Sequence, residues 1–262
     1  RWLLVLPNGD VLVAESRTEA MGGMPPEVIA ALSRQGVFGP SANRIVLLRP
    51  GATGVARHVL VEGLRQPFGM ALLGDHLYVA NTDGVVRFPF RPGTTRLTAP
   101  AEPVIALPAG PPNNHWTRTL LATADGSHLY VSVGAATNVD EEGRDPPDRA
   151  AIWEIRPDGT GKRLVATGLR NPVGLAYEPS TGALWTTVNE RDGLGQDVPP
   201  DYLTRVVDGA FYGWPHVYFG TYPDPVQAKR DPAAVEAARA RARVPDLALG
   251  AHTVPLGLHF PR

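Results

Sequence analysis

The chain of 262 residues contains no cysteine. A disulfide framework, a thiolate nucleophile and a zinc site built on cysteines are therefore excluded. The apolar runs are only a few residues long, far short of the roughly 20 residues that a membrane-spanning helix needs. Basic and acidic residues nearly balance, at 25 and 26, so no strong field attracts nucleic acid or anionic lipid. The sequence predicts neither a nucleic-acid partner nor a membrane span.

Glycine and proline are abundant instead, with 28 and 27 residues spread along the whole length. Hydrophobic residues make up 43% and charged residues 19%, which allows a sizeable core and excludes global disorder. Patterns with a helical period are scarce. Short alternating apolar segments separated by turn residues indicate an all-β protein.

One pattern recurs along the chain: a short apolar strand, a turn with glycine, and a second strand whose apolar residues alternate. The four copies cover residues 3–16, 69–84, 120–134 and 174–190. Further strands are expected at residues 43–50, 84–90, 150–159 and 201–207. Paired hairpins that recur roughly every 50 to 65 residues are typical of the blades of a β-propeller. We therefore predict an all-β, β-propeller fold with four to five blades visible.

The repeat is unfinished at its end. "LRQPFGMAL" (64–72) and "LRNPVGLAY" (169–177) nearly match, and "TVPLGLHF" (253–260) begins a fifth copy without its turn. An unfinished repeat leaves an unpaired sheet edge. We expect residues 1–262 to form a single propeller domain that is incomplete at the C-terminus and also at the N-terminus. The first residue is arginine, so either a leader has been removed or the chain is an excised piece.

Two segments depart from the repeat. Residues 231–244 are rich in alanine and arginine, and Pro232 stands at a favourable helix start, so a short surface helix is expected there. Residues 17–42 are rich in glycine, proline and methionine, and we interpret them as a long loop on the functional face.

The segments before each first strand carry chemically active side chains. A propeller places these segments around one end of its central channel, so we expect their side chains to line one pit. They contain Trp2, Gln66, Phe68, His115, Trp116, Arg118, Arg170, Asn171 and His252. Guanidinium groups pair with carboxylates and aromatic rings stack, so this set suits a planar anionic ligand.

A known family matches this pattern. Residues 168–215, which contain "NERD", "PPDYLT" and "FYGWP", resemble the signature of the PQQ-dependent soluble sugar dehydrogenases, in the L-sorbosone and aldose sugar dehydrogenase branch. "HWTRTL" (115–120) and "LGAHTVPLGLHF" (249–260) resemble that branch too. Members are six-bladed propellers that hold pyrroloquinoline quinone (PQQ) through calcium and oxidise aldoses or related aldehydes. The resemblance implies such an oxidoreductase, acting on a small sugar or a sorbosone-like aldehyde, in the bacterial periplasm or secreted.

The resemblance also assigns roles to residues. His115 aligns with the general base, and an imidazole suits proton transfer near neutral pH. Arg170 and Asn171 match the cofactor contacts of the "RNP" motif, although Arg170 could instead form a salt bridge between blades. Gln66 and Trp116 are expected near the cofactor, and Arg118 either contacts it or pairs between blades.

Calcium is expected in the loop 189–201. By resemblance, backbone carbonyls near Asn189, Glu190 and Arg191 would hold the ion, since calcium prefers oxygen ligands. Asp201 would act behind the ion or through its water. Two other carboxylates of the loop are alternatives: Asp192 and Asp197. An acidic, glycine-rich loop without an ion is the remaining interpretation.

The chain departs from the family pattern at two positions. Glucose-oxidising relatives have an aspartate where this chain has Ala135, so Asn138 or Asp140 would have to orient the histidine. Tyr202 replaces an acidic residue of those relatives, so their additional pair of structural calcium ions is not expected. Tyr212 is interpreted as a residue that shapes its blade.

Two other functions remain open at this point. A calcium-dependent propeller lactonase would need three or four carboxylate and asparagine side chains converging on the axis, and the only acidic cluster is at 189–201. A non-catalytic propeller that binds a peptide or glycan would have a neutral axis, with no basic group beside His115.

Overall fold

The computed structural model describes residues 2–19 and 25–261. The chain folds into two compact units, which are described separately below. The first consists of Arg1–Pro112, Trp116–Leu129 and Arg156–Thr160, and the second of Asn113–His115, Tyr130–Ile155 and Gly161–Arg262. In the residues that the structure describes, no helix is long and apolar enough to cross a membrane.

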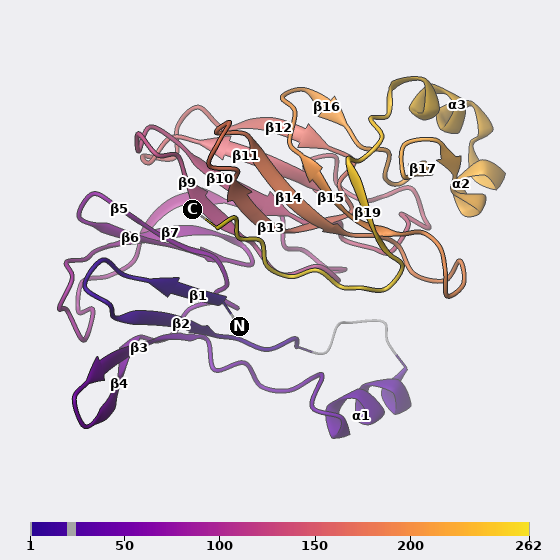
Figure 1. Cartoon of the computed structure of the whole chain (residues 1–262). Coiled ribbons are helices and arrows are strands. Elements are labelled where there is room, and N and C mark those ends of the chain that lie inside the picture. Colours follow the sequence, from indigo (N-terminus) through magenta and orange to yellow (C-terminus); the bar gives the residue numbers. More distant parts are fainter. Residues whose placement is uncertain (1, 20–24, 262) are drawn as a thin grey trace. The chain divides into compact units, whose positions relative to one another are not determined.

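The first unit contains two antiparallel sheets of four strands (Figure 1), each in sequence order. The first sheet consists of β1 (Trp2–Val5), β2 (Val11–Glu15), β3 (Arg44–Gly51) and β4 (Gly54–Val61). The second consists of β5 (Met70–Leu73), β6 (His76–Asn81), β7 (Gly84–Pro89) and β8 (Glu102–Ala106). Strand β9 (Leu120–Ala122) also lies in this unit. Alternate side chains such as Leu12 and Ala14 are buried in a core shared by both sheets, as the period of two predicts.

The second unit carries two further sheets. One has the order β16-β12-β11-β10, and the other the order β13-β14-β15-β19. The first is formed by β10 (Leu129–Val133), β11 (Ala151–Ile155), β12 (Arg163–Thr167) and β16 (Ala210–Phe211). The second is formed by β13 (Asn171–Tyr177), β14 (Leu184–Asn189), β15 (Asp201–Arg205) and β19 (Leu247–Gly250). The four sheets have the strand order of propeller blades, so the predicted all-β propeller class is confirmed.

The predicted hairpin turns are present between the first two strands of each copy. Gly9, between β1 and β2, has φ of +84° and donates its N–H to the carbonyl of Leu6. Gly182, between β13 and β14, has φ of +70°. Only glycine adopts this backbone region without strain, which is why glycine marks both turns.

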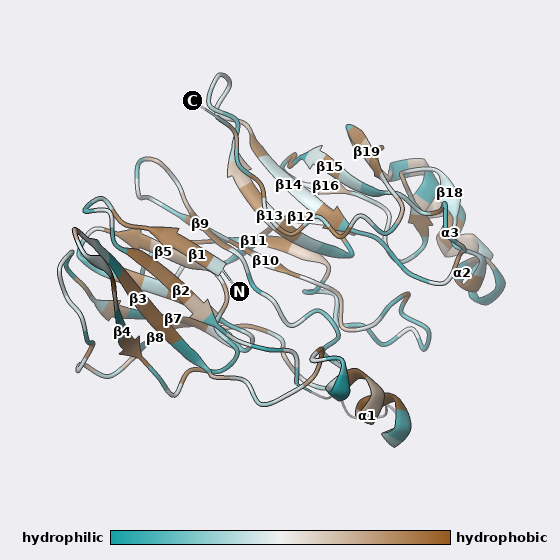
Figure 2. Ribbon diagram, turned by 60° about the horizontal axis from the view of Figure 1, so that its bottom comes forward, coloured by the Kyte–Doolittle hydropathy of each residue, from teal (hydrophilic) through white to brown (hydrophobic). Residues whose placement is uncertain are grey.

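The predicted helix at residues 231–244 is also present, as α3 (Pro232–Arg241). Pro232 opens it, and Asp231 caps it by accepting from the N–H of Ala234. Val235 and Ala238 lie one turn apart on the same face and pack against Val217 of the ribbon formed by β17 (Val217–Tyr218) and β18 (Tyr222–Pro223). A second short helix, α2 (Pro225–Arg230), precedes it. Figure 2 shows apolar residues concentrated on the strands, polar residues on most of the loops, and residues of both kinds on the helices.

The structure differs from the sequence-based expectation in two segments. Within residues 17–42, predicted to be a loop, Pro26–Arg34 forms helix α1, with Pro26 at its start and Glu27 and Arg34 in its first and last turns. The glycine- and methionine-rich part of that predicted loop, residues 20–24, lies outside the described residues. Residues 253–260, expected to begin a new blade, form no strand. They run along β14, where Thr187 and Asn189 both donate to the carbonyl of Pro255.

Candidate functional site

A cavity of about 170 Å³ lies in the second unit, at one end of the β13-β14-β15 sheet. Seven residues predicted for catalysis, cofactor or metal line it: His115, Arg170, Asn171, Asn189, Glu190, Arg191 and Asp201. Asp192, Pro199, His252 and Val254 complete the lining. The expectation that positions 115 and 170 share one cavity is confirmed.

Strand order explains why these residues meet. β13 begins at Asn171, β14 ends at Asn189, and β15 begins at Asp201. In an antiparallel sheet the start of one strand lies beside the end of the next, and Asn171 is indeed the register partner of Asn189. The residues just before β13 and just after β14 therefore gather at one sheet end.

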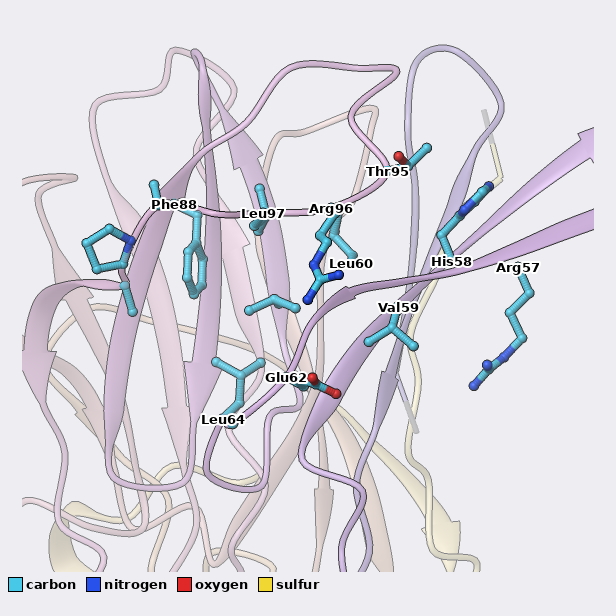
Figure 3. Close-up of a pocket in the computed structure, with 15 residues that line it drawn as sticks. Arg57, His58, Val59, Leu60, Glu62, Leu64, Phe88, Thr95, Arg96 and Leu97 are labelled. Carbon is cyan, nitrogen blue, oxygen red and sulfur yellow. The ribbon is translucent and has the colours of Figure 1, made fainter.

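A second cavity, of about 770 Å³, lies in the first unit, along β4 and residues 95–101 (Figure 3). Its lining combines apolar side chains such as Leu60, Phe88 and Leu97 with the exposed cations Arg57 and Arg96. None of the predicted site residues lines it. Size alone does not identify an active site, whereas converging polar and titratable groups do, so we assign the candidate site to the smaller cavity.

The ring of His115 is oriented by a backbone group. Its Nδ1 lies 2.8 Å from the carbonyl oxygen of Ala135. A carbonyl can only accept a hydrogen bond, so Nδ1 carries the proton and Nε2 is the basic nitrogen of the neutral ring. The side chain of Asn138 contacts Arg170 and Asp192 instead. The expectation that Asn138 or Asp140 orients the ring is wrong, because the main chain at Ala135 already supplies the acceptor.

Asp140 is hydrogen-bonded within its own loop, and its Oδ2 lies 3.7 Å from Arg230 of α2. Its Oδ1 accepts from the backbone N–H groups of Arg144 and Asp145. Asp145 in turn accepts from the N–H groups of Ala136 and Thr137. The loop after β10 is thus folded around its own carboxylates, which fixes the main chain at Ala135.

The buried side chain of Arg170 is hydrogen-bonded to two loops, at Asn138 and at Asn189 and Glu190. It is 4% exposed, and its Nε and Nη2 donate to the carbonyl and the side-chain oxygen of Asn138, at 3.0 and 2.7 Å. Its Nη1 donates to the carbonyls of Asn189 (3.3 Å) and Glu190 (2.6 Å). Nη2 also lies 3.4 Å from Asp192. Burial lowers the pKa of Arg170, and the neighbouring carboxylates oppose this shift. The guanidinium therefore positions the carbonyls of Asn189 and Glu190, two of the three residues near which the resemblance predicts calcium.

Backbone oxygens dominate the predicted metal loop. In the described ranges 2–19 and 25–261, no group of three or more His, Asp or Glu side chains is placed to hold a metal ion. The Arg191 side chain is paired with Asp224, with Nε 2.9 Å from Oδ2. An ion in this loop would depend on the carbonyls of Asn189 and Glu190, single side chains and water, which are ligands that calcium accepts.

Two buried oxygens of the cavity lining have no hydrogen-bond partner within the described part of the chain. They are Oδ1 of Asn171 and Oε1 of Glu190. Buried polar atoms are nearly always paired, and leaving one unpaired costs about 1–3 kcal/mol. Both atoms are therefore suited to a ligand or an ion bound in the cavity.

Comparison with known proteins identifies the family. The TrAA12-like model matches residues 51–202, more than half of the chain. The chain belongs to the TrAA12-like family. A pyrroloquinoline quinone-dependent sugar dehydrogenase from Hypocrea jecorina is 29% identical to it, over 40% of this chain and 30% of that protein. The resemblance to PQQ-dependent sugar dehydrogenases is thereby confirmed. The chain spans 39% and 30% of the lengths of two curated relatives that it matches.

Two solved structures have a fold similar to that of this chain. The holo form of the pyranose dehydrogenase PQQ domain from Coprinopsis cinerea has a TM-score of 0.72 and 19% identity, covering 99% of this chain and 67% of that one. The calcium structure of the family AA12 enzyme from Trichoderma reesei has a TM-score of 0.71 and 20% identity, covering 98% and 69%. At this identity the likeness establishes the fold of the TrAA12-like chain.

Three predicted cofactor residues lie in the first unit of the TrAA12-like chain. Nε2 of Gln66 donates to the carbonyl of Arg17 at 3.2 Å, and Nε1 of Trp116 donates to Thr18 at 3.0 Å. Arg118 is fully buried and donates to the carbonyls of Thr117 and Pro108. Their part in cofactor binding stays a prediction.

Tyr212 has the structural role expected from the sequence. It is fully buried, its hydroxyl donates to the carbonyl of Arg205, and it accepts from the N–H of Val207. The nearby Trp214 donates its indole N–H to the carbonyl of Asn138 at 3.1 Å, which the sequence analysis missed. Asn138 thereby joins the Trp214 segment to Arg170.

Replacing Gly134 tests how closely the site is packed. A Cβ at this position would lie 2.5 Å from Oδ1 of Asn171 and 2.6 Å from Cβ of His115. The Gly134→Ala variant is expected to lose about 1–3 kcal/mol of unfolding free energy, because both neighbours must move. Urea unfolding measures the loss. Gly110→Ala, with nothing within 4 Å of the new Cβ, is the matched control. Equal stability of the two variants would contradict the packing described here.

The buried carboxyl of Glu190 is expected to make the unfolding free energy depend on pH. Burial raises its pKa to about 7, and the Arg170 charge and the Arg191 N–H offset only part of this. In the unfolded chain the carboxyl titrates near 4.5. Between these values the folded protein keeps a proton that the unfolded chain has released, so the unfolding free energy falls as the pH rises. The expected slope is about 1.4 kcal/mol per pH unit.

The Glu190→Gln variant isolates this contribution. Urea unfolding of both proteins in calcium-free buffer, at several pH values across the window, gives the difference in slope. The variant is expected to lack the slope that Glu190 adds, since an amide does not titrate. Parallel curves for the two proteins would show that the carboxyl is ionised in the folded state throughout.

Proposed function

We propose that this chain acts as a PQQ- and calcium-dependent oxidoreductase that oxidises an aldose or a sugar-derived, sorbosone-like aldehyde, with His115 as general base. The observation that carries the proposal is the position of His115. Its Nδ1 is fixed on a backbone carbonyl, and it shares a cavity with Arg170, Asn171 and the carbonyl-bearing loop after β14. A periplasmic or secreted location belongs to the same proposal, and the absence of cysteine is compatible with it.

The residues present fit the two groups that the family relatives are named for. The buried Arg170 supplies positive charge for an anionic cofactor, and the unpartnered Oδ1 of Asn171 marks an amide free to contact it. The carbonyls of Asn189 and Glu190 accept from Arg170, and each carbonyl oxygen has a second lone pair. These oxygens would hold calcium, with Asp201 fixing the N–H of Glu190 from behind.

When bound, PQQ polarised by calcium supplies the hydride acceptor. The contribution of this chain is the proton transfer and the positioning. His115 would take the proton of the sugar hydroxyl at Nε2 as the adjacent carbon loses its hydride, while Nδ1–H stays on the carbonyl of Ala135. Arg170 and Asn171 would orient the cofactor through charge and hydrogen bonding.

Reconstitution tests the proposal. The purified protein is mixed with PQQ and calcium, and dye reduction is followed with sorbosone, glucose and a lactone. Reduction by an aldose or aldehyde that requires both PQQ and calcium, and stops on chelation, is expected. Hydrolysis of the lactone without PQQ would favour the lactonase. Binding of a sugar with no turnover would favour a non-catalytic propeller. A lactonase is disfavoured by the lack of a carboxylate cluster in the described residues.

A further inference from the structure

The buried guanidinium of Arg149 contacts both the main chain of His115 and the acceptor of its ring. Arg149 is 3% exposed and lies two residues before β11. Its Nη2 donates to the carbonyl of His115 (3.2 Å), to that of Ala135 (3.1 Å) and to Oδ1 of Asn113 (2.8 Å), and its Nε donates to the carbonyl of Gly134 (2.8 Å). One side chain thus joins the segment 113–115 to the end of β10.

The Ala135 carbonyl is held at a defined angle. It accepts from both Nδ1 of His115 and Nη2 of Arg149, which uses its two lone pairs. The N–H of the same residue donates to the carbonyl of Arg170 at 2.7 Å. Both the N–H and the carbonyl of Ala135 are therefore held by hydrogen bonds. The direction of the carbonyl in turn fixes the plane of the imidazole ring.

Arg149 keeps its charge in this position. Burial lowers its pKa to about 10, and the charges of Asp145 and Asp148 oppose that shift. All its donors are therefore present near neutral pH. Its hydrogen-bond partners named above are neutral oxygens, so its burial is not offset by an ion pair with any of them.

We propose that Arg149 is the positioning residue of the His115 base: its guanidinium holds the Ala135 carbonyl and the His115 main chain so that the ring keeps its Nδ1–H tautomer and Nε2 remains the unprotonated nitrogen. The inference rests on the proposed function for what Nε2 does, but not for the tautomer. A carboxylate usually orients such a base. Here the same tautomer is set through a neutral carbonyl, which adds no negative charge beside the ring.

The tautomer is measured directly by ¹⁵N NMR of the histidine rings at a pH where they are neutral. The chain has 7 histidines, and the spectrum of His115→Gln identifies the signals of His115. The wild-type protein is expected to show the Nδ1–H tautomer alone. Arg149→Met is expected to show a mixture with Nε2–H, and Arg149→Lys, which keeps the charge and a donor, to lie closer to wild type.

Kinetics of the reconstituted enzyme provide the second readout. Arg149→Met is expected to lower kcat about 10- to 100-fold with little change in KM, because a misoriented base affects the transition state and not substrate binding. Arg149→Lys is expected to recover part of this loss. Arg163→Met is the matched control, since Arg163 pairs with Glu154 and Asp208 on exposed surface. It is expected to leave tautomer and kcat unchanged.

Each outcome decides the inference. A wild-type spectrum dominated by Nε2–H overturns it without any variant. Unchanged tautomer and kcat in Arg149→Met overturn it as well. If Arg149→Met does not fold, Asn113→Ala removes one of the contacts of Nη2 and is expected to shift the tautomer ratio in the same direction, by less. A fixed Nδ1–H tautomer in a protein that oxidises no aldose with PQQ and calcium would support the positioning role and overturn the proposed function.

Discussion

The His115→Gln variant is expected to lose about 10³-fold in kcat for aldose oxidation, with a much smaller change in KM. Glutamine keeps a neutral polar side chain of similar reach, but it cannot take a proton near neutral pH. The hydrogen bond from Nδ1 to Ala135 leaves Nε2 as the only basic atom of the ring, so no other position on this side chain can substitute for it. Steady-state dye reduction with saturating PQQ and calcium gives both constants.

His128→Gln is the control for this substitution. The His128 ring contacts Ser127 on the turn after Asp125, and it is not among the residues that line the candidate cavity. Its kcat is expected to match that of the wild type. Equal loss in both variants, or no loss in His115→Gln, would remove His115 from the catalytic role. PQQ binding by absorbance, measured separately, distinguishes a lost base from a lost cofactor site.

The blades could be predicted from sequence because their signals are local. A turn glycine such as Gly9 or Gly182 and the two-residue alternation beside it determine a hairpin within about 15 residues. The helix at Pro232–Arg241 was predictable for the same reason, since its proline start lies next to the segment it shapes. Helix α1 was missed because glycine, proline and methionine around it indicated a loop, while the nine helical residues are only a small part of that segment.

Residues 253–260 show that a local sequence signal is not sufficient to form a strand. Their sequence matches the start of a blade, yet a strand exists only where another strand accepts its hydrogen bonds. In the described residues this segment instead packs along β14, where Pro255 accepts from Thr187 and Asn189 and the ring of Phe260 lies 6.2 Å from that of Trp185. The expected blade start at this segment is therefore not observed, because the pairing of a strand depends on a neighbouring strand that the local sequence does not determine.

The resemblance predicted those residues of the candidate site whose side chains belong to sequence motifs. It did not predict the contacts that backbone groups make. His115 and Arg170 belong to short motifs, and the structure brings them to one cavity. The acceptor for His115 is a backbone carbonyl, which every residue type has. The residue type at position 135 therefore indicated only that the aspartate of the glucose-oxidising relatives is absent, and not that Ala135 orients the ring. Arg149 belongs to no motif, and its contacts come from tertiary structure alone.

Removing the carboxylate of Asp201 is expected to destabilise the protein by about 2–4 kcal/mol and to weaken calcium binding. Asp201 is 4% exposed, and its Oδ1 accepts from the N–H of Glu190 at 2.8 Å. Its Oδ2 accepts from the N–H of Val254 (2.8 Å) and from Thr253 Oγ1 (3.2 Å). In Asp201→Ala the buried N–H of Glu190 and the partly buried N–H of Val254 lose their acceptor. An unpaired buried group costs about 1–3 kcal/mol, and a partly buried one costs less.

The same contacts link stability to the metal loop. Because Asp201 fixes the peptide of Glu190, its loss frees the carbonyls that the proposal assigns to calcium, while segment 253–254 detaches from β15. Urea unfolding with and without calcium measures both effects, and hydrogen exchange at the N–H groups of Glu190 and Val254 locates them. Asp197→Ala, which removes an exposed carboxylate of the same loop, is expected to change the unfolding free energy by less than about 0.5 kcal/mol. If Asp197→Ala instead abolished calcium binding and Asp201→Ala did not, the ion would be held by the loop's exposed carboxylates and the carbonyl site at Asn189 and Glu190 would be wrong.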